Sequence, residues 1–251
     1  PTSAAGAPSR FQLGAGASLS NGIVGHAGDT LFGPLGGASF TITGTDAGTA
    51  AGVSFQGVSK LVGGTGSDVF TFGAAGRMSG GIDGGGGQDA IVGPAAATTF
   101  TIDGADAGTV TSGGLTTQFT GIGRLQGSDT GPNQFIANAG ASLSAGVFGG
   151  SAANDTLRIS GDVTTASYVG TGIGSGIYTL DGRTLAYSGI ETLTDNVTAR
   201  TRVVTGSDAS DAIFIRQDAA NRITVYTLST APSFDSVSFS GALDALTVHG
   251  G

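Results

Sequence analysis

Short runs in which apolar and polar residues alternate recur along the whole chain. Clear examples are SFTITG at 39–44, TTFTIDG at 98–104 and RITVYTL at 222–228. A period of two places one apolar face of a β-strand against a core and the other face toward solvent. No stretch shows a convincing 3.6-residue period, so the pattern predicts β-strands of about 3 to 6 residues throughout.

The chain also repeats itself at a period of about 60 residues. FTITGTDAG at 40–48 returns as FTIDGADAG at 100–108, and YTLDG at 178–182 is the weaker third copy. Similar tails follow each copy, FQGVSKLVGG, FTGIGRLQGS and YSGIETLTD, and a second family of segments lies at 11–31, 70–91 and 135–157. Self-similarity of this kind is typical of a stacked array of structural units.

A shorter period lies inside the long one. An apolar residue follows each turn Asp or Asn, and all spacings but the last are near one or two multiples of about 21 residues. These apolar residues are Leu31, Phe70, Ile91, Phe135, Leu157 and Ile213. We therefore predict an all-β fold, a right-handed parallel β-helix (β-solenoid) with coils of about 21 residues.

This solenoid is expected to be a single domain over 1–251, a fragment of a longer chain, with an irregularity or boundary at 169–204. The alternative is a pair of β-sandwich domains divided within 160–200.

Equivalent positions of successive coils stack in a solenoid, so the repeats also predict two interior columns of aromatic side chains. One column is expected to contain Phe40, Phe100 and Tyr178, and the other Phe11, Phe70 and Phe135.

Composition narrows the classes of function. The chain has 48 Gly among 251 residues, 39% hydrophobic residues and no Cys, which suits a folded, turn-rich protein without disulfides or zinc–thiolate sites. A formal net charge of −8 argues against nucleic acid as a partner, because phosphate backbones require clustered Lys and Arg. No apolar run is long enough for a membrane-spanning segment.

The segment FTITGTDAGTAAGVSFQGVSKLVGGTGSDVFTF at 40–72 resembles the Gly/Asp-rich repeats of very large secreted or surface-bound bacterial proteins. The similar groups are the filamentous haemagglutinin-like and the haemolysin-type calcium-binding repeats. That resemblance implies an extracellular or cell-surface location, a parallel β-helical architecture and a role in adhesion, biofilm or the cell envelope.

Two nonapeptides fit the Gly-Gly-x-Gly-x-Asp-x-apolar-x template of the calcium-binding repeats, GGTGSDVFT at 63–71 and GGGGQDAIV at 84–92. The resemblance implies that such turns stack and hold Ca²⁺ between carboxylates and backbone carbonyls. The candidate calcium residues are Asp68, Asp89, Gly64, Gly66, Gly85 and Gly87. The two motifs lie one 21-residue coil apart, whereas the family uses coils of 18 residues, so a metal-free turn is the alternative that we favour.

The sequence favours a structural or adhesive module without enzymatic activity or a cofactor other than calcium. Expected partners are further copies of the chain, associating end to end into filaments, or a ligand on a host or cell surface. A carbohydrate-binding or carbohydrate-active β-helix is the alternative, for which Asp46, Asp103 and Asp106 form the nearest approach to a carboxylate cluster.

Overall fold

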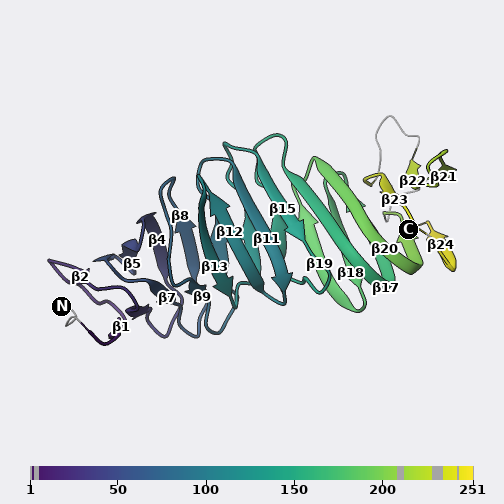
Figure 1. Cartoon of the computed structure of the whole chain (residues 1–251). Helices are drawn as coiled ribbons and strands as arrows, with labels where there is room; N and C mark the ends of the chain where they lie inside the picture. The colour runs from purple at the N-terminus through teal and green to yellow at the C-terminus, as the bar shows by residue number, and fades with distance from the viewer. Residues whose placement is uncertain (1, 3–5, 208–211, 228–233, 242, 251) are drawn as a thin grey trace.

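The computed structural model describes residues 2, 6–207, 212–227, 234–241 and 243–250. Within these ranges the chain forms strands, bends and turns and contains no helix, so the all-β prediction is confirmed. Figure 1 shows the strands lying side by side along the long axis of an elongated molecule, with the N-terminus near one end and the C-terminus near the other.

Most strands belong to two hydrogen-bonded series, which we call the first and second ribbons. The first ribbon runs in the order β1 (Arg10–Gln12), β3 (Thr30–Phe32), β7 (Lys60–Val62), β9 (Ile82–Asp83), β13 (Leu115–Thr120), β12 (Ala107–Ser112), β11 (Thr98–Gly104), β15 (Asn133–Ala137), β17 (Thr156–Gly172), β20 (Thr192–Thr205) and β24 (Ala245–His249).

The second ribbon runs in the order β2 (Ile23–Val24), β6 (Val53–Gln56), β5 (Ala47–Ala50), β4 (Ser39–Gly44), β8 (Val69–Phe72), β10 (Ala90–Val92), β14 (Arg124–Gln126), β16 (Gly146–Phe148), β19 (Arg183–Ser188) and β18 (Ser175–Leu180), and joins the first ribbon at β17. A separate antiparallel sheet contains β21 (Ile213–Gln217), β22 (Ile223–Thr227) and β23 (Val237–Phe239).

The chain crosses from one ribbon to the other after almost every strand. β7 lies in the first ribbon, β8 in the second, β9 in the first and β10 in the second. We call each pair of strands contributed in this way a layer. Successive layers pair in parallel and in register, for example Leu61 with Ile82 and Phe70 with Ile91. This arrangement carries the short period of the sequence, because partners in adjacent plain layers are 20 to 22 residues apart.

Three antiparallel inserts interrupt this regular stacking. They are the strand triplets β4–β5–β6, β11–β12–β13 and β17–β18–β19, and each widens a ribbon before parallel pairing resumes. Layers that carry an insert are therefore longer, and their equivalent residues are 30 to 40 residues apart. The 60-residue repeat of the sequence reflects plain layers combined with one insert.

Each insert bends at a β-bulge, and these bulges identify the true third copy of the repeat. The register shifts between Ile42 and Gly44 in the first copy, between Ile102 and Gly104 in the second, and between Gly170 and Gly172 in the third. Tyr168 thus corresponds to Phe40 and Phe100, so the assignment of YTLDG at 178–182 as the third copy is wrong. In the third copy, Gly170 occupies the position of Ile42 and Ile102 before the bulge. This glycine in place of an apolar residue hid the equivalence in the sequence.

The predicted aromatic columns are also wrong, although most of their members lie in the core. Phe40 stacks on Phe70 with ring centroids 4.5 Å apart, and Phe100 stacks on Phe135 at 4.9 Å. Tyr178 is likewise buried, whereas Phe11 is partly buried and pairs with Leu31. The reason is topological: the insert of the first repeat lies in the second ribbon, and that of the second repeat lies in the first ribbon.

The region 169–204 contains the end of β17, all of β18 and β19, and most of β20. β17 and β20 pair in parallel and in register from Thr156 with Thr192 to Val169 with Thr205. Parallel ladders also dominate both ribbons, whereas β-sandwiches are built from antiparallel sheets.

The stacked rings generate a direct test of the core. We expect Phe70→Ala to lower the free energy of unfolding by about 3–5 kcal/mol, because it removes a fully buried ring that packs on Phe40. Val69→Ala, one position away on the outer face, is the control and should cost no more than about 1 kcal/mol. Urea denaturation of both variants measures the difference, and equal losses would contradict the stacked core.

Candidate functional site: the stacked glycine and aspartate turns

The aspartates of the two nonapeptides point into the structure. Asp68 is 0% exposed and Asp89 is 1% exposed. Oδ2 of Asp68 accepts the backbone N–H of Gly64 in its own turn at 2.7 Å, and Oδ1 accepts the N–H of Ala38 from the preceding layer, also at 2.7 Å. Oδ1 of Asp89 accepts the N–H of Asp68 at 2.7 Å. Each carboxylate therefore fastens one layer to the next.

The same contact recurs in both ribbons, and we call the series the carboxylate ladder. Asp29 accepts the N–H of Ser9, Asp155 accepts that of Asn133, and Glu191 accepts that of Asp155. Every acceptor stands two residues before an inward apolar residue, as Asp68 stands before Phe70. The repeated Asp and Asn residues make this spacing visible in the sequence, whereas Glu191 was not predicted to be a member.

The glycines of the two motifs allow the backbones of neighbouring turns to approach closely. A Cβ atom on Gly64 would clash with the carbonyl oxygen of Pro34, and one on Gly66 would clash with the backbone nitrogen of Gly37. Side chains on Gly85 and Gly87 would clash with the preceding turn in the same way, and both residues have positive φ, 89° and 113°. Close approach accounts for Gly64 and Gly66, and close approach together with positive φ accounts for Gly85 and Gly87, so stacking explains all four glycines.

Burial disfavours the charged form of both aspartates. It raises the pKa of Asp68, against two backbone hydrogen bonds that lower it. Burial also raises the pKa of Asp89 to about 6, with a smaller contribution from the negative charges of Asp68 and Asp83. Oδ2 of Asp89 makes no hydrogen bond to any described residue.

These hydrogen bonds limit the capacity of the turns to bind a cation. Ca²⁺ takes 6 to 8 oxygen ligands, but three of the four carboxylate oxygens of Asp68 and Asp89 already accept backbone N–H groups. In the part of the chain that the structure describes, no three His, Asp or Glu side chains gather where they can hold a metal. Calcium binding here would require exchange of these hydrogen bonds, and the calcium site stays a prediction.

The structure does not bring the other candidate carboxylates together. Asp46 accepts the N–H and the hydroxyl of Ser79 at 2.7 and 2.6 Å, and Asp106 accepts the N–H of Ser144 at 2.7 Å. Both have positive φ at the tip of an insert, 56° and 51°, and each ties its own insert to the following layer. Asp103 is exposed on β11. Asp46 and Asp106 therefore hold turns in place at separate levels of the stack.

An open groove of about 430 Å³ lies beside Asp106. Ser142, Ser144, Arg183 and Thr184 also line it. Glycoside hydrolysis needs two carboxyl groups that flank the scissile bond, and Asp106 is the one carboxylate among the groove's described lining residues.

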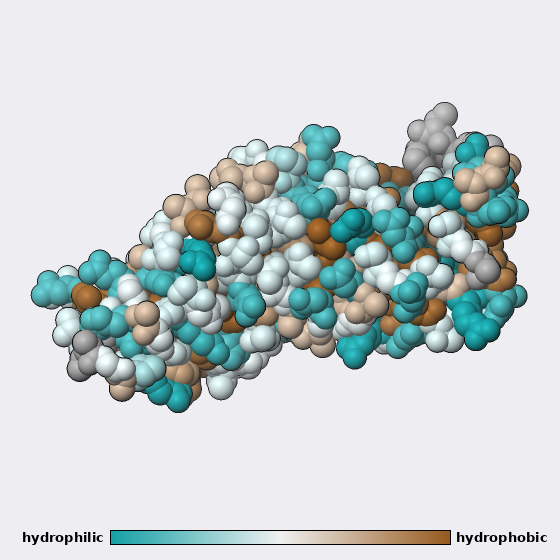
Figure 2. Space-filling view, viewed as in Figure 1, coloured by the Kyte–Doolittle hydropathy of each residue, from teal (hydrophilic) through white to brown (hydrophobic). Residues whose placement is uncertain are grey.

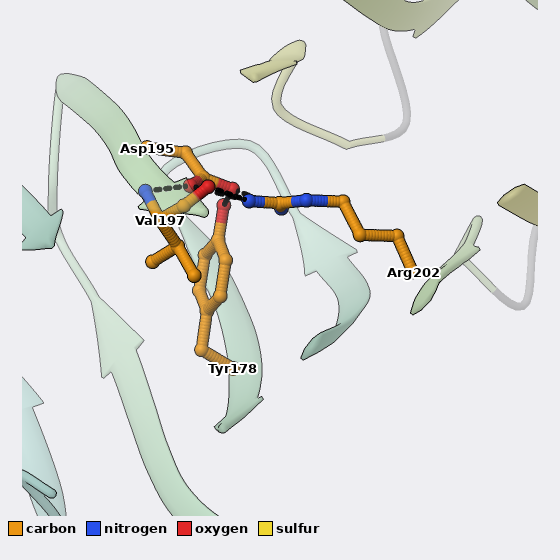
Figure 3. A network of polar contacts seen from close by, with 4 residues as sticks. All are labelled: Tyr178, Asp195, Val197 and Arg202. Carbon is orange, nitrogen blue, oxygen red and sulfur yellow. Dashed lines mark hydrogen bonds and ion pairs between the residues drawn. The ribbon is translucent and has the colours of Figure 1, made fainter. Parts of the chain in front are cut away.

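A second polar cluster, which the sequence analysis missed, lies where β20 meets the C-terminal segment. Figure 3 shows Arg202 reaching Asp195, with the hydroxyl of Tyr178 and the backbone of Val197 at the same carboxylate. Nη1 of Arg202 lies 2.6 Å from Oδ2 of Asp195, and both side chains are almost fully buried. The guanidinium also lies over the ring of Phe239 at 4.2 Å. Burial raises the pKa of Tyr178 well above its usual value, so its hydroxyl stays protonated and donates to Asp195.

This buried cluster anchors the C-terminal segment to the stack. The hydroxyl of Tyr187 donates to Asp235 at 2.9 Å, and Phe234 packs against Tyr168. Removing one partner of a buried ion pair leaves the other charge buried and unpaired, which is strongly destabilising. Both terminal nitrogens of Arg202 are bonded within the cluster, whereas its buried Nε has no hydrogen-bond partner among the described residues.

Comparisons with family models, with curated proteins and with solved structures gave no match to this chain. The described residues also include no helix with the length and apolar character needed to cross a bilayer.

Proposed function

We propose that the chain is a right-handed parallel β-solenoid that serves as a structural or adhesive module of an extracellular bacterial surface protein. It acts by presenting a long, regular surface, without catalysis. Its partners are other copies of the chain, end to end, or a ligand on a host or cell surface.

One observation carries the proposal: the signature residues of the repeat are used to hold layers together. Asp68 and Asp89 accept N–H groups across layers, and Asp46 and Asp106 fasten the inserts. The motif glycines permit close contact between turns. A repeat whose distinctive residues serve stacking is typical of a scaffold, in which length and surface are the functional properties.

The outer surface supports a scaffold role. Thr and Ser residues face outward in rows across the inserts, such as Thr41, Thr49 and Ser54 in the first and Thr99, Thr111 and Thr116 in the second. Figure 2 shows hydrophilic and neutral residues over most of the visible face, with apolar residues in small separate patches. The resemblance of 40–72 to repeats of exported proteins supports the extracellular location.

End-to-end association is supported by the strand edges at the C-terminal end of the stack. β24 pairs in parallel with β20, and no other described strand covers its second edge. An uncovered edge strand is a template for pairing with another chain.

We expect concentrated protein to associate through this edge. Thr247→Lys places a charge on exposed β24 and should weaken association at least tenfold, because lysine on an edge strand disfavours strand pairing. Gln118→Lys adds the same charge on exposed β13, within the stack, and is the matched control. Analytical ultracentrifugation over a concentration series compares them. A wild-type chain that stays monomeric at every concentration would refute the assembly part of the proposal.

The second expectation concerns calcium. We propose that folding does not depend on it, because the turn carboxylates already have backbone partners and the core continues through layers without a complete motif. The chain in chelator should therefore unfold in a cooperative thermal transition. Its melting midpoint should change little when millimolar Ca²⁺ is added. A ligand at 100 times its Kd stabilises the folded state by about 2.7 kcal/mol. Loss of folded structure in chelator would instead establish a metal site on which folding depends.

A further inference from the structure

Asp155 stands directly before β17 and is 0% exposed. Its Oδ1 accepts two hydrogen bonds from Asn133 of the preceding layer, from the backbone nitrogen at 2.7 Å and from Nδ2 at 2.9 Å. Its Oδ2 is also buried but has no hydrogen-bond partner among the described residues. One oxygen of this carboxyl is thus satisfied and the other is not.

The unsatisfied oxygen lies near the backbone carbonyl of Gly189. A Cβ atom built on Gly149 would meet both the carbonyl oxygen of Gly189 and Oδ2 of Asp155, so these two oxygens border the same point. A buried acceptor without a donor is costly, because it does not regain the hydrogen bond it made with water. A proton on Oδ2 would turn this contact into a hydrogen bond.

Asn133 offers an internal comparison, one layer away. It borders Gly127 and the carbonyl of Gly149 just as Asp155 borders Gly149 and the carbonyl of Gly189. In this layer the side chain supplies the donor, because Nδ2 of Asn133 lies 3.3 Å from the carbonyl oxygen of Gly149. The ladder therefore uses an N–H donor at one level where the next level has a carboxyl oxygen.

We propose that Asp155 is held as a neutral carboxylic acid whose Oδ2–H donates to the carbonyl of Gly189, so that its protonation makes the stability of this layer depend on pH. The proton comes from solvent when the chain folds above the ordinary pKa of aspartate. It returns to solvent when the pH rises far enough to ionise the buried group.

The surrounding charges favour the neutral form. Burial raises the pKa of Asp155, and the negative charges of Glu191 and Asp129 raise it further, against the hydrogen bonds from Asn133. Arg158, further along β17, is exposed. Because the folded pKa lies above the unfolded one, the stabilisation is complete below the unfolded pKa and is lost as the pH rises through the folded pKa.

The first measurement is a titration of the wild-type chain, following the side-chain carboxyl ¹³C shift of Asp155. We expect a midpoint above that of the exposed Asp162, whose signal is the internal reference. An ordinary or lowered midpoint for Asp155 would overturn the proposal, and this outcome does not depend on any variant folding.

The second measurement compares melting midpoints of variants at pH 4 and pH 8. Asp155→Asn supplies a permanent donor, so it should leave the midpoint at pH 4 nearly unchanged and raise it at pH 8 by roughly 2–5 °C. Asn133→Asp is the reciprocal control and should lower the midpoint more at pH 8 than at pH 4. If Asp155→Asn lowered the midpoint equally at both pH values, the carboxylate would be acting as an acceptor alone, and the proposal would be wrong.

Discussion

The stack depends on a hydrogen bond between a turn carboxylate in one layer and a backbone N–H in the layer before it. It occurs in both ribbons, at Asp68 with Ala38 and at Asp29 with Ser9. Hydrogen bonds to charged groups contribute about 1.5–3 kcal/mol each, and this one also sets the height at which the next strand begins. Inward residues two positions later then fall into register, as Phe70 does with Phe40.

The inserts give the stack its long period without disturbing this contact. Each adds two antiparallel strands to a ribbon and then returns the chain to parallel pairing, so a hydrogen bond across an insert joins residues 30 or 36 apart instead of about 21. Asp46 and Asp106 fix the inserts by bonding to Ser79 and Ser144. The hydrogen bonds of the turn carboxylates and the length of the repeat both follow from the pairing of each layer with the next.

Strand positions and the short period could be predicted because both are written locally, in alternating residues and in the spacing from Asp68 to Phe70. The pairing of Phe40 with Phe70 rather than Phe100 could not, since it depends on which ribbon receives each insert. The Arg202–Asp195 pair was equally hidden, because its partners include Phe239, which reaches the cluster only through tertiary packing. For the candidate site, the motif identified Asp68 and Asp89 as special but did not reveal that their oxygens face backbone N–H groups.

Engineered disulfides measure the register between layers directly, because the chain has no Cys. Ser39 and Val69 are exposed register partners on β4 and β8, and adjacent strands lie about 4.8 Å apart, within the range that a disulfide spans. Ser39→Cys with Val69→Cys should therefore oxidise to an intramolecular bond, whereas Ser39→Cys with Thr99→Cys should keep two free thiols. Bonding of the second pair and not of the first would contradict the layered account.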